Sequence, residues 1–268
     1  MSCNSYLSTV NRQILAKNRE DEGSVNTSIE WLGRHLRAWE GFDEVDDYFP
    51  FGSYIKNTCL PRCVDNTADV DYIIIFNTNH LAPQTYLNKV NRFIEAKYPR
   101  STRYQSHPTI VLDMNNIKFE VMPAVHLWGN GTNYYNIPAS QAGPVVWTTT
   151  QPQELQQRLN SADARYGGLL RPVIRLIKYW NVRSGKILTS FRIEEYVISQ
   201  TYLGCNNLAD FFFYAVRYLS MCEPLPEYKR QRLNSFMNIV STAENYKRLG
   251  YEPTAEQILR TLLPEIVE

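Results

Sequence analysis

Two short stretches decide the fold: residues 51–54 read Phe-Gly-Ser-Tyr, and residues 68–76 read Ala-Asp-Val-Asp-Tyr-Ile-Ile-Ile-Phe. The long apolar run in the second stretch predicts a strand that is buried on both faces. Asp69 and Asp71 lie two residues apart at its start, so their carboxylates project from the same face. Such carboxylates repel each other unless a cation lies between them, and oxygen ligands suit Mg²⁺. A turn through Gly52 and Ser53 can present N–H groups and a hydroxyl to a phosphate, so the pattern indicates a site for a nucleoside triphosphate and its metal ions.

A third carboxylate comes from a later apolar stretch. Residues 116–124 read Asn-Ile-Lys-Phe-Glu-Val-Met-Pro-Ala and predict a short strand with a single acid, Glu120. Catalysis by two metal ions needs such a third acid, so that one ion is held against the attacking hydroxyl and the other against the triphosphate. Asp113, at the edge of a predicted strand Thr109–Leu112, is the alternative ligand. Its setting in Asp-Met-Asn-Asn favours an ordinary turn residue.

Together these motifs resemble those of the polymerase β-like nucleotidyltransferases. Within that superfamily the chain is most similar to the bacterial cyclic-oligonucleotide synthases, which are relatives of cyclic GMP-AMP synthase and oligoadenylate synthase. Residues 170–181, Leu-Arg-Pro-Val-Ile-Arg-Leu-Ile-Lys-Tyr-Trp-Asn, and residues 190–194, Ser-Phe-Arg-Ile-Glu, resemble the helical half of those enzymes. The resemblance runs from about Tyr48 to about Tyr196. The chain departs from the superfamily in having Glu120 where an aspartate is more usual.

The resemblance implies an α/β (α+β) fold. Residues 1–150 would form a nucleotidyltransferase lobe with a mixed sheet, and residues 151–268 would form a helical lobe like that of oligoadenylate synthase. An N-terminal helix would bridge the two lobes. The apolar spacing in Leu7–Arg19 and Ser28–Trp39 agrees with one long helix, with or without a break, or with a pair of amphipathic helices.

The same resemblance implies the roles of individual residues. Asp69, Asp71 and Glu120 would be the catalytic acids and would hold Mg²⁺, or Mn²⁺ in its place. The implied nucleotide-binding set, for ATP or other nucleoside triphosphates, is Gly52, Ser53, Asp71, Lys178 and Ser190. Lys178 would reach the donor triphosphate as a compact point charge. Without the resemblance, Ser190 is the expected N-cap of a helix over Phe191–Tyr202.

The implied activity is the joining of ribonucleoside triphosphates into a cyclic di- or trinucleotide, with release of pyrophosphate. The product would act as a second messenger in antiphage (CBASS-type) signalling, read by a separate effector protein. Two other hypotheses stay open on the sequence. The chain could transfer a nucleotide to a macromolecular acceptor such as tRNA or protein, or it could be a catalytically silent nucleotide-binding scaffold. Base choice, ring size, linkage and the need for activation do not follow from the sequence.

Composition and charge limit the kinds of partner that the sequence predicts. The 268 residues carry a net charge of +1 and no block rich in Lys or Arg, so we expect no long nucleic acid activator. A local basic cluster of Arg171, Arg175 and Lys178 is expected along one helix, off its buried stripe. Five scattered cysteines, no long apolar run and no signal peptide pattern predict a cytoplasmic protein that does not enter a membrane. We expect a monomer or a complex with a regulatory protein, and no zinc site at Cys59 and Cys63.

The rest of the chain is expected to be largely helical, with one long irregular insertion. Residues 129–150 are rich in Gly, Asn and Pro and show no clear period, which is typical of a loop over a functional cleft. The aromatic residues in and beside this stretch could stack on a nucleobase or anchor the loop: Trp128, Tyr134, Tyr135 and Trp147. His107 and His126 are expected to be packing or surface residues. Further helices are predicted over Pro83–Tyr98, Leu169–Asn181, Leu208–Met221, Glu227–Thr242 and Thr254–Leu263.

Overall fold

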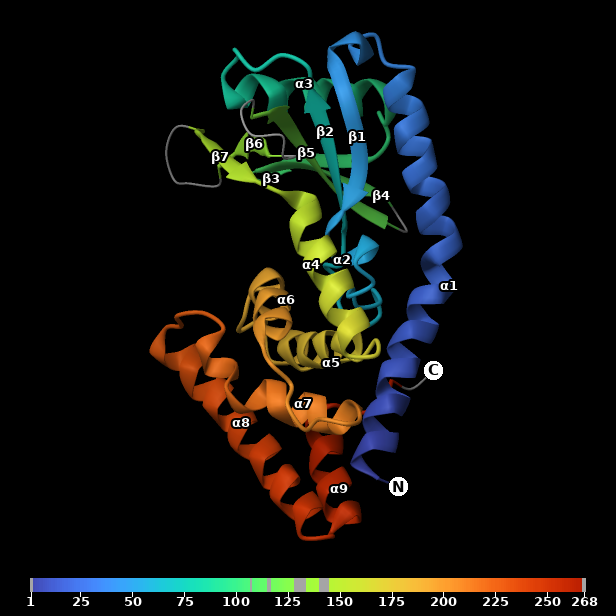
Figure 1. Cartoon of the computed structure of the whole chain (residues 1–268). Coiled ribbons are helices and arrows are strands. Elements are labelled where there is room, and N and C mark those ends of the chain that lie inside the picture. Colours follow the sequence, from blue (N-terminus) through green and yellow to red (C-terminus); the bar gives the residue numbers. More distant parts are fainter. Residues whose placement is uncertain (1, 107, 115–116, 128–133, 140–144, 267–268) are drawn as a thin grey trace. The chain divides into compact units, whose positions relative to one another are not determined.

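The computed structural model describes the chain apart from residues 1, 107, 115–116, 128–133, 140–144 and 267–268 (Figure 1). The residues group into two compact units, each made of segments that are separate in the sequence. The helical unit consists of Met1–Glu20, Thr58–Asn66 and Gln157–Glu268, and the sheet unit consists of Asp21–Asn57 and Thr67–Gln156. The lobe boundary expected near residue 150 stays a prediction.

The sheet unit is built on a mixed sheet with the strand order β1-β2-β5-β4-β3, to which β6 adds beside β5 and β7 beside β6 (Figure 1). Its strands are β1 (Val45–Phe51), β2 (Val70–Phe76), β3 (Thr102–Ser106), β4 (Thr109–Met114), β5 (Ile117–His126), β6 (Tyr135–Pro138) and β7 (Trp147–Thr150). Strands β2 and β5 run parallel, and the other pairs that the structure describes are antiparallel. The central position of β2 explains its apolar run, since every residue of the strand except Asp71 is buried.

Helix α3 (Pro83–Lys97) covers one face of this sheet. Its apolar residues recur at helical spacing and are all buried: Tyr86, Leu87, Val90, Phe93 and Ile94. They share a core with Leu32 and Leu36 from the C-terminal part of α1 (Cys3–Arg37) and with the apolar side chains of β2, β4 and β5. The helix expected over Pro83–Tyr98 is therefore present, and its core-facing stripe holds the helix against the sheet.

The helical unit combines the first part of α1 with six helices from the C-terminal half. These are α4 (Pro152–Arg165), α5 (Leu170–Arg183), α6 (Ser190–Ser199), α7 (Leu208–Arg217), α8 (Glu227–Arg248) and α9 (Glu252–Leu262). Helix α5 lies within the core, with ten of its fourteen residues buried. Trp180 of α5 stacks on Phe236 of α8, with ring centroids 3.8 Å apart. This packing gives the unit its own hydrophobic core, separate from that of the sheet unit.

The structure decides between the two alternatives for the N-terminal segment and differs from the expectation in one later segment. Residues 3–37 form one continuous helix, as the interpretation as a single long helix predicted, and not a pair of helices. The expected irregular insertion over residues 129–150 contains two short paired strands, β6 and β7, which extend the sheet beyond β5. Four-residue strands in a Gly- and Asn-rich stretch leave too short a pattern to be recognised from the sequence.

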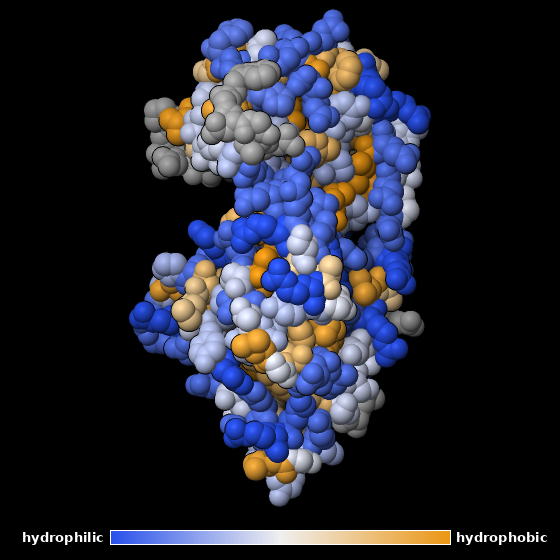
Figure 2. Space-filling view, in the orientation of Figure 1, coloured by the Kyte–Doolittle hydropathy of each residue, from blue (hydrophilic) through white to orange (hydrophobic). Residues whose placement is uncertain are grey.

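The helices and the exposed face of the molecule can be compared with what a membrane span requires. Within the described residues, no helix is both long enough and apolar enough to span a bilayer. The face shown in Figure 2 is mostly hydrophilic, with apolar residues gathered in small separate patches. Large exposed apolar residues such as Leu203 and Met221 belong to connecting segments, and isolated residues of this kind are common on protein surfaces.

Candidate active site

The Gly-Ser turn lies directly against one of the predicted catalytic acids. Strand β1 ends at Phe51, which pairs with Asp71 of β2, and the chain then enters the one-turn helix α2 (Gly52–Ile55). Gly52 has a φ of +75°, and an ideal Cβ at this position would lie 1.7 Å from Asp71 Oδ2. Only glycine tolerates both the left-handed backbone and this approach to the carboxylate. Ser53, half-buried in α2, follows at once, so the turn and Asp71 form one local arrangement.

The three predicted acids lie at the same end of two adjacent parallel strands. Asp71 of β2 is paired in register with Glu120 of β5, and Asp69 comes immediately before β2. The side chains of Asp69 and Glu120 are 28% and 27% exposed, so both are largely withdrawn from water. Burial, followed by the charges of Asp71 and Glu120, raises the pKa of Asp69 to about 7. The sheet unit therefore contains a cluster of carboxylates whose mutual repulsion is only partly compensated.

The partial compensation comes from Lys118, a residue that the sequence analysis did not single out. Its Nζ lies 3.5 Å from Glu120 Oε1 and 3.9 Å from Asp69 Oδ2, and its side chain is 17% exposed. Lys118 precedes Glu120 by two residues on β5 and so shares its face. This spacing was the available signal, because a lysine two residues from a predicted metal ligand in a strand must point toward the same site.

A metal ion suits this donor set, although the carboxylates are not closed around one. Hard divalent cations prefer carboxylate oxygens, which Asp69, Asp71 and Glu120 supply. In the part of the chain that the structure describes, however, no group of three His, Cys, Asp or Glu side chains is already spaced to hold an ion. Mg²⁺ needs oxygens at about 2.0–2.1 Å, so these side chains would have to draw together on binding. The ligand roles of the three acids remain predictions.

Asp113, the alternative ligand, occupies a strand and not the turn in which it was expected. It lies within β4, where it pairs in register with Lys118 of β5. Val111, two residues earlier, is the position opposite Glu120. The turn interpretation is wrong because the antiparallel pairing of β4 and β5 continues to Met114, beyond the expected end of the strand. Asp113 adds another acid to the neighbourhood of Lys118.

Lys178, predicted to reach the triphosphate, is buried in the helical unit. Its side chain is 5% exposed, and Nζ donates to Glu194 Oε1 at 2.6 Å. Thr58 donates its hydroxyl to the same carboxylate oxygen at 2.6 Å. The ammonium group is thus already held by a carboxylate in this structure, and binding a phosphate would require Lys178 to share or exchange that partner.

Ser190 is exposed and forms the first residue of α6, but it is not the N-cap. That role belongs to Thr189, whose side chain accepts a hydrogen bond from the backbone N–H of Arg192. Both residues carry a hydroxyl suited to capping, and Thr189 is the one with the extended backbone that an N-cap requires. The expectation that Ser190 caps the helix is therefore wrong, while its role toward phosphate stays a prediction.

The expected basic cluster on α5 is paired inside the helical unit. Arg175 is 3% exposed, and its Nε donates to Asn11 Oδ1 at 2.9 Å. Burial lowers the pKa of its guanidinium to about 10. Arg171 forms an ion pair with Asp163 of α4. Placing Arg175 and Lys178 off the buried stripe was wrong, because α5 is enclosed on several sides and not only along one face.

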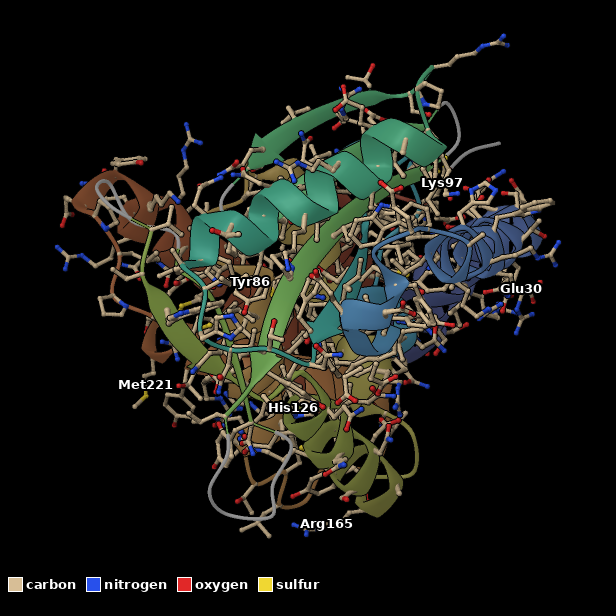
Figure 3. All side chains as sticks on the ribbon, turned by 90° about the horizontal axis from the view of Figure 1, so that it is seen from above. Glu30, Tyr86, Lys97, His126, Arg165 and Met221 are labelled. Carbon is tan, nitrogen blue, oxygen red and sulfur yellow. The ribbon has the colours of Figure 1, made fainter. Side chains whose placement is uncertain are left out.

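Within residues 128–150, the described aromatic side chains mainly pack against neighbouring elements of the sheet unit. Tyr135 is 3% exposed and lies beside Phe49 and His126, and His126 contacts Asp46 with 2.6 Å between Nε2 and Oδ2. Trp147 packs on Tyr86 of α3, which Figure 3 labels along with His126. Tyr134 is 36% exposed. Trp128 and His107 lie outside the described residues.

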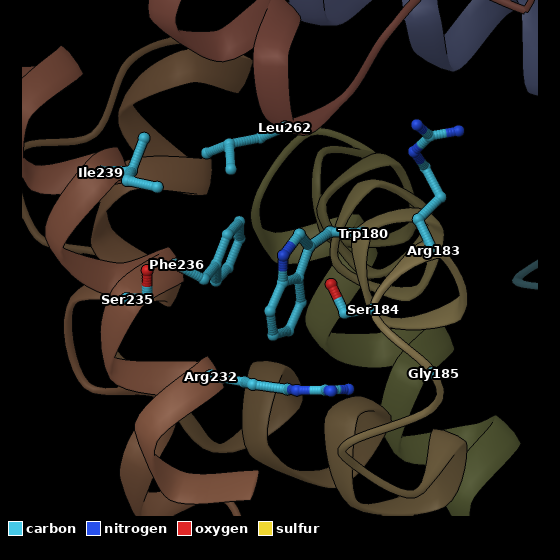
Figure 4. Close-up of a pocket in the computed structure, with 9 residues that line it drawn as sticks. All are labelled: Trp180, Arg183, Ser184, Gly185, Arg232, Ser235, Phe236, Ile239 and Leu262. Atoms are coloured by element: carbon cyan, nitrogen blue, oxygen red, sulfur yellow. The ribbon is translucent and has the colours of Figure 1, made fainter. Parts of the chain in front are cut away.

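A cavity in the helical unit involves none of the predicted site residues (Figure 4). It is lined mainly by α5, α8 and the Ser184–Gly185 turn, and Trp180 and Phe236 lie stacked in it with Arg232 beneath them. The two rings are 4% and 2% exposed, so their faces are largely occupied by each other. The cavity is therefore separate from the acid cluster and adds no ligand to it.

Comparison with known proteins relates this geometry to one family. A model of the Second Messenger Oligonucleotide or Dinucleotide Synthetase domain matches residues 1–162. A "Probable cyclic nucleotide synthase" of Bacillus cereus (strain VD146) is 24% identical over 225 residues, which cover 67% of this chain and 65% of that protein, just under two thirds of its length.

Solved structures show the same fold. CdnC of E. coli MS115-1 with ATP aligns over 98% of both chains with a TM-score of 0.70 and 13% identity. The same enzyme in a complex with HORMA-deltaN aligns over 94% of this chain and 96% of that one, with a TM-score of 0.68 and 12% identity. At these identities the likeness establishes the fold, and it confirms the expected nucleotidyltransferase architecture with its mixed sheet.

Proposed function

Because the chain belongs to the Second Messenger Oligonucleotide or Dinucleotide Synthetase family, as the resemblance of its motifs predicted, we propose that it joins ribonucleoside triphosphates into a cyclic di- or trinucleotide. The observation that carries the proposal is the gathering of Asp69, Asp71 and Glu120 on and beside adjacent parallel strands, where burial and the charges of Asp71 and Glu120 raise the pKa of Asp69. A cluster of this kind costs stability, and such clusters concentrate at functional sites.

The reaction is nucleotidyl transfer. A ribose hydroxyl of the acceptor attacks the α-phosphorus of the donor, the bond to the leaving phosphate breaks, and pyrophosphate departs. Asp69, Asp71 and Glu120 would hold Mg²⁺ or Mn²⁺ ions, which when bound favour deprotonation of the hydroxyl and neutralise the triphosphate. A second transfer within the same molecule closes the ring.

The remaining residues bind and orient the donor. Gly52 brings the backbone against Asp71, so a phosphate bound at the turn lies close to the carboxylates. The hydroxyl of Ser53 donates to a β- or γ-phosphate oxygen, and Ser190 donates to phosphate from the start of α6. Lys178 supplies a positive charge whose position is set by Glu194 and Thr58. Positioning and electrostatics carry most of the rate enhancement in phosphoryl transfer.

The product would serve as a second messenger in antiphage signalling of the CBASS type, read by a separate effector. The family description supports a second messenger as the product, and the relative from Bacillus cereus is a probable cyclic nucleotide synthase; the antiphage role is the part of the proposal that goes beyond them. The complex of CdnC with HORMA-deltaN supports a regulatory protein as partner for this chain as well. ATP is the first donor to test, since CdnC was solved with ATP.

One reaction tests the activity. The purified chain is incubated with Mg²⁺ or Mn²⁺ and all four labelled ribonucleoside triphosphates, treated with phosphatase, and separated by chromatography with mass detection. A phosphatase-resistant cyclic product is expected, and its mass identifies the bases. The Asp69→Asn, Asp71→Asn double variant should lose activity by about a thousandfold or more, because both predicted metal ligands are neutralised.

Other outcomes would replace the proposal. Label on tRNA or protein would indicate a transferase with a macromolecular acceptor. Nucleotide binding with no free product and no label on a macromolecule would indicate a silent scaffold. Activity retained by the double variant would remove the three acids from the mechanism.

A further inference from the structure

Lys118 is surrounded by acids on its own strand and on both neighbouring strands. Asp69 lies beside it at the start of β2, Glu120 follows it on β5, and Asp113 is its partner in register on β4. The distances from Nζ to Asp69 and Glu120, 3.9 Å and 3.5 Å, are those of ion pairs without tight hydrogen bonds. Lys118 therefore contributes one positive charge among several carboxylates.

The location of this lysine follows from the sheet. Residues 118 and 120 share a face of β5, and the parallel register with β2 puts Asp71 beside Glu120. A lysine at residue 118 has a four-carbon stem that can fold back along the strand or extend away from it. Its side chain is 17% exposed, so the ammonium group retains a path to water.

We propose that Lys118 is a positioning residue for the metal site: its ammonium group is an internal counter-cation that holds Asp69 and Glu120 while no divalent ion is bound and is displaced when one binds. The inference rests on the proposed function, because it takes the three acids to be metal ligands. It also gives a physical reason why they are gathered without being closed around an ion.

Displacement follows from charge and size. A divalent cation brings two charges to within about 2.1 Å of the carboxylate oxygens, whereas the ammonium group brings one charge to a longer distance. The metal ion therefore binds the carboxylate oxygens more strongly than the ammonium group does, and its charge repels the lysine. Lys118 should accordingly raise the metal concentration needed to fill the site, and it should stabilise the protein before the metal arrives.

The first test follows the lysine in the wild-type protein. Amine acetylation with a water-soluble reagent, read by mass spectrometry of peptides, is compared with and without Mn²⁺. We expect the acetylation rate of Lys118 to rise at least threefold on adding Mn²⁺, because the displaced amine reaches water. Lys17, paired with Glu20 at 3.0 Å on α1, serves as the internal control and should not change. A rate that stays constant or falls at Lys118 would overturn the proposal.

The second test measures affinity. Mn²⁺ is titrated calorimetrically into wild type, Lys118→Met, Lys118→Arg and, as a control for the loss of one lysine, Lys17→Met. Lys118→Met should bind Mn²⁺ about tenfold more tightly, a difference of about 1.4 kcal/mol, while Lys118→Arg should restore an affinity near that of wild type. If Lys118→Met does not fold without metal, the arginine variant and the acetylation experiment still decide the matter.

Different results would overturn the proposed metal site and the proposed role of Lys118. Mn²⁺ binding that is unchanged in the Asp69→Asn, Asp71→Asn protein would overturn the metal site, and with it the role of Lys118. Binding that this double variant abolishes, but that Lys118→Met leaves at wild-type affinity or weakens, would overturn the role of Lys118 alone.

Discussion

The two units differ in how closely their buried and partly buried charged side chains are paired. In the helical unit, Lys178 and Glu194 form a pair with 2.6 Å between Nζ and Oε1, and Thr58 donates to the same oxygen. In the sheet unit, Lys118 lies at longer distances, 3.9 Å from Asp69 Oδ2 and 3.5 Å from Glu120 Oε1, and burial with the charges of Asp71 and Glu120 raises the pKa of Asp69. The charges of the first group are closely paired, whereas the carboxylates of the second group repel one another.

The difference teaches where to look for function. A buried ion pair with good geometry offsets its own desolvation, and removing one partner exposes the full penalty. Carboxylates that repel one another lower stability, and such clusters concentrate at functional sites. This difference supports the proposal that the acid cluster binds a ligand, whereas the pair of Lys178 and Glu194 stabilises the fold of its own unit.

The largest effect is expected from breaking the matched cluster. Glu194→Ala would leave the Lys178 ammonium buried without its carboxylate and should lower the free energy of unfolding by about 3–5 kcal/mol. Urea denaturation followed by circular dichroism measures this loss.

The neighbouring residue Glu195 supplies the control on the same helix. It pairs with Arg192 at the surface, with 2.8 Å between Oε2 and NH1, so Glu195→Ala should change the free energy of unfolding by only about 0–1 kcal/mol. Equal losses in the two variants would contradict the distinction between a matched buried pair and a surface pair.

Gly52→Ala should damage the junction between the turn and Asp71. The new Cβ would combine a left-handed backbone with a collision against the carboxylate, and we expect a loss of about 2–4 kcal/mol in the free energy of unfolding. Nucleotidyl transfer should fall as well, because Asp71 must move.

Gly168→Ala separates the two causes. Gly168 also has a positive φ, +81°, but no atom lies within 4 Å of its ideal Cβ, so only the backbone strain of about 1–2 kcal/mol applies. If Gly52→Ala were no more destabilising than Gly168→Ala, the close approach to Asp71 would have no energetic role.

Removing one charge from the acid cluster should have a smaller effect, and it should raise the free energy of unfolding where the preceding variants lower it. In the folded protein the pKa of Asp69 is about 7, above its ordinary value of 3.8, so the folded state disfavours the ionised carboxylate. Stability without metal should therefore fall as the pH rises from about 4 to 7. At pH 7.5 in the presence of a chelator, Asp69→Asn should raise the free energy of unfolding by about 1–2 kcal/mol.

Thermal unfolding across pH 4–8 checks this prediction, with Asp113→Asn on β4, the strand that pairs with the other side of β5, as the control. The gain should disappear when Mn²⁺ is added, because the metal stabilises the wild-type carboxylates and not the variant. A variant that is less stable than wild type without metal would show that repulsion does not govern the cluster.

Much of the sheet unit could be predicted because its signals are local. The period of two in a strand places Asp69 and Asp71 on one face, and the unbroken apolar run identifies β2 as a central strand. The same rule applied to β5 would have found Lys118. The turn at Gly52 could also be predicted from the sequence, although the close approach of Gly52 to Asp71 depends on how β1 and β2 pair.

The remaining features depend on contacts between distant residues. Nothing local indicates that Glu194 would meet Lys178 or that Thr58 would join them, since 136 positions separate Thr58 from Glu194. Arg175 was expected off the buried stripe because the periodicity of α5 reports one face, whereas the helix is covered on several. The choice of Thr189 over Ser190 as N-cap depends on backbone angles that two neighbouring hydroxyl residues cannot reveal.

The smallest effect concerns His35, a titratable group in the sheet unit outside the acid cluster. Burial, followed by the charges of Lys97 and Arg34, lowers the pKa of its imidazole, and its ring packs against Tyr98 with centroids 5.1 Å apart. The unfolded chain therefore takes up this proton more readily, so stability should be lost as the pH falls below about 6.5.

His35→Gln should reduce that loss of stability by less than about 1 kcal/mol, as measured by urea denaturation at pH 5.5 and 7.5. His80→Gln, at an exposed position, controls for the removal of an imidazole. Because the acid cluster changes stability in the opposite direction over the same range, the His35 contribution is best measured in the Asp69→Asn background. A steeper pH dependence in the His35 variant would mean that the folded state favours the charged imidazole, contrary to its burial.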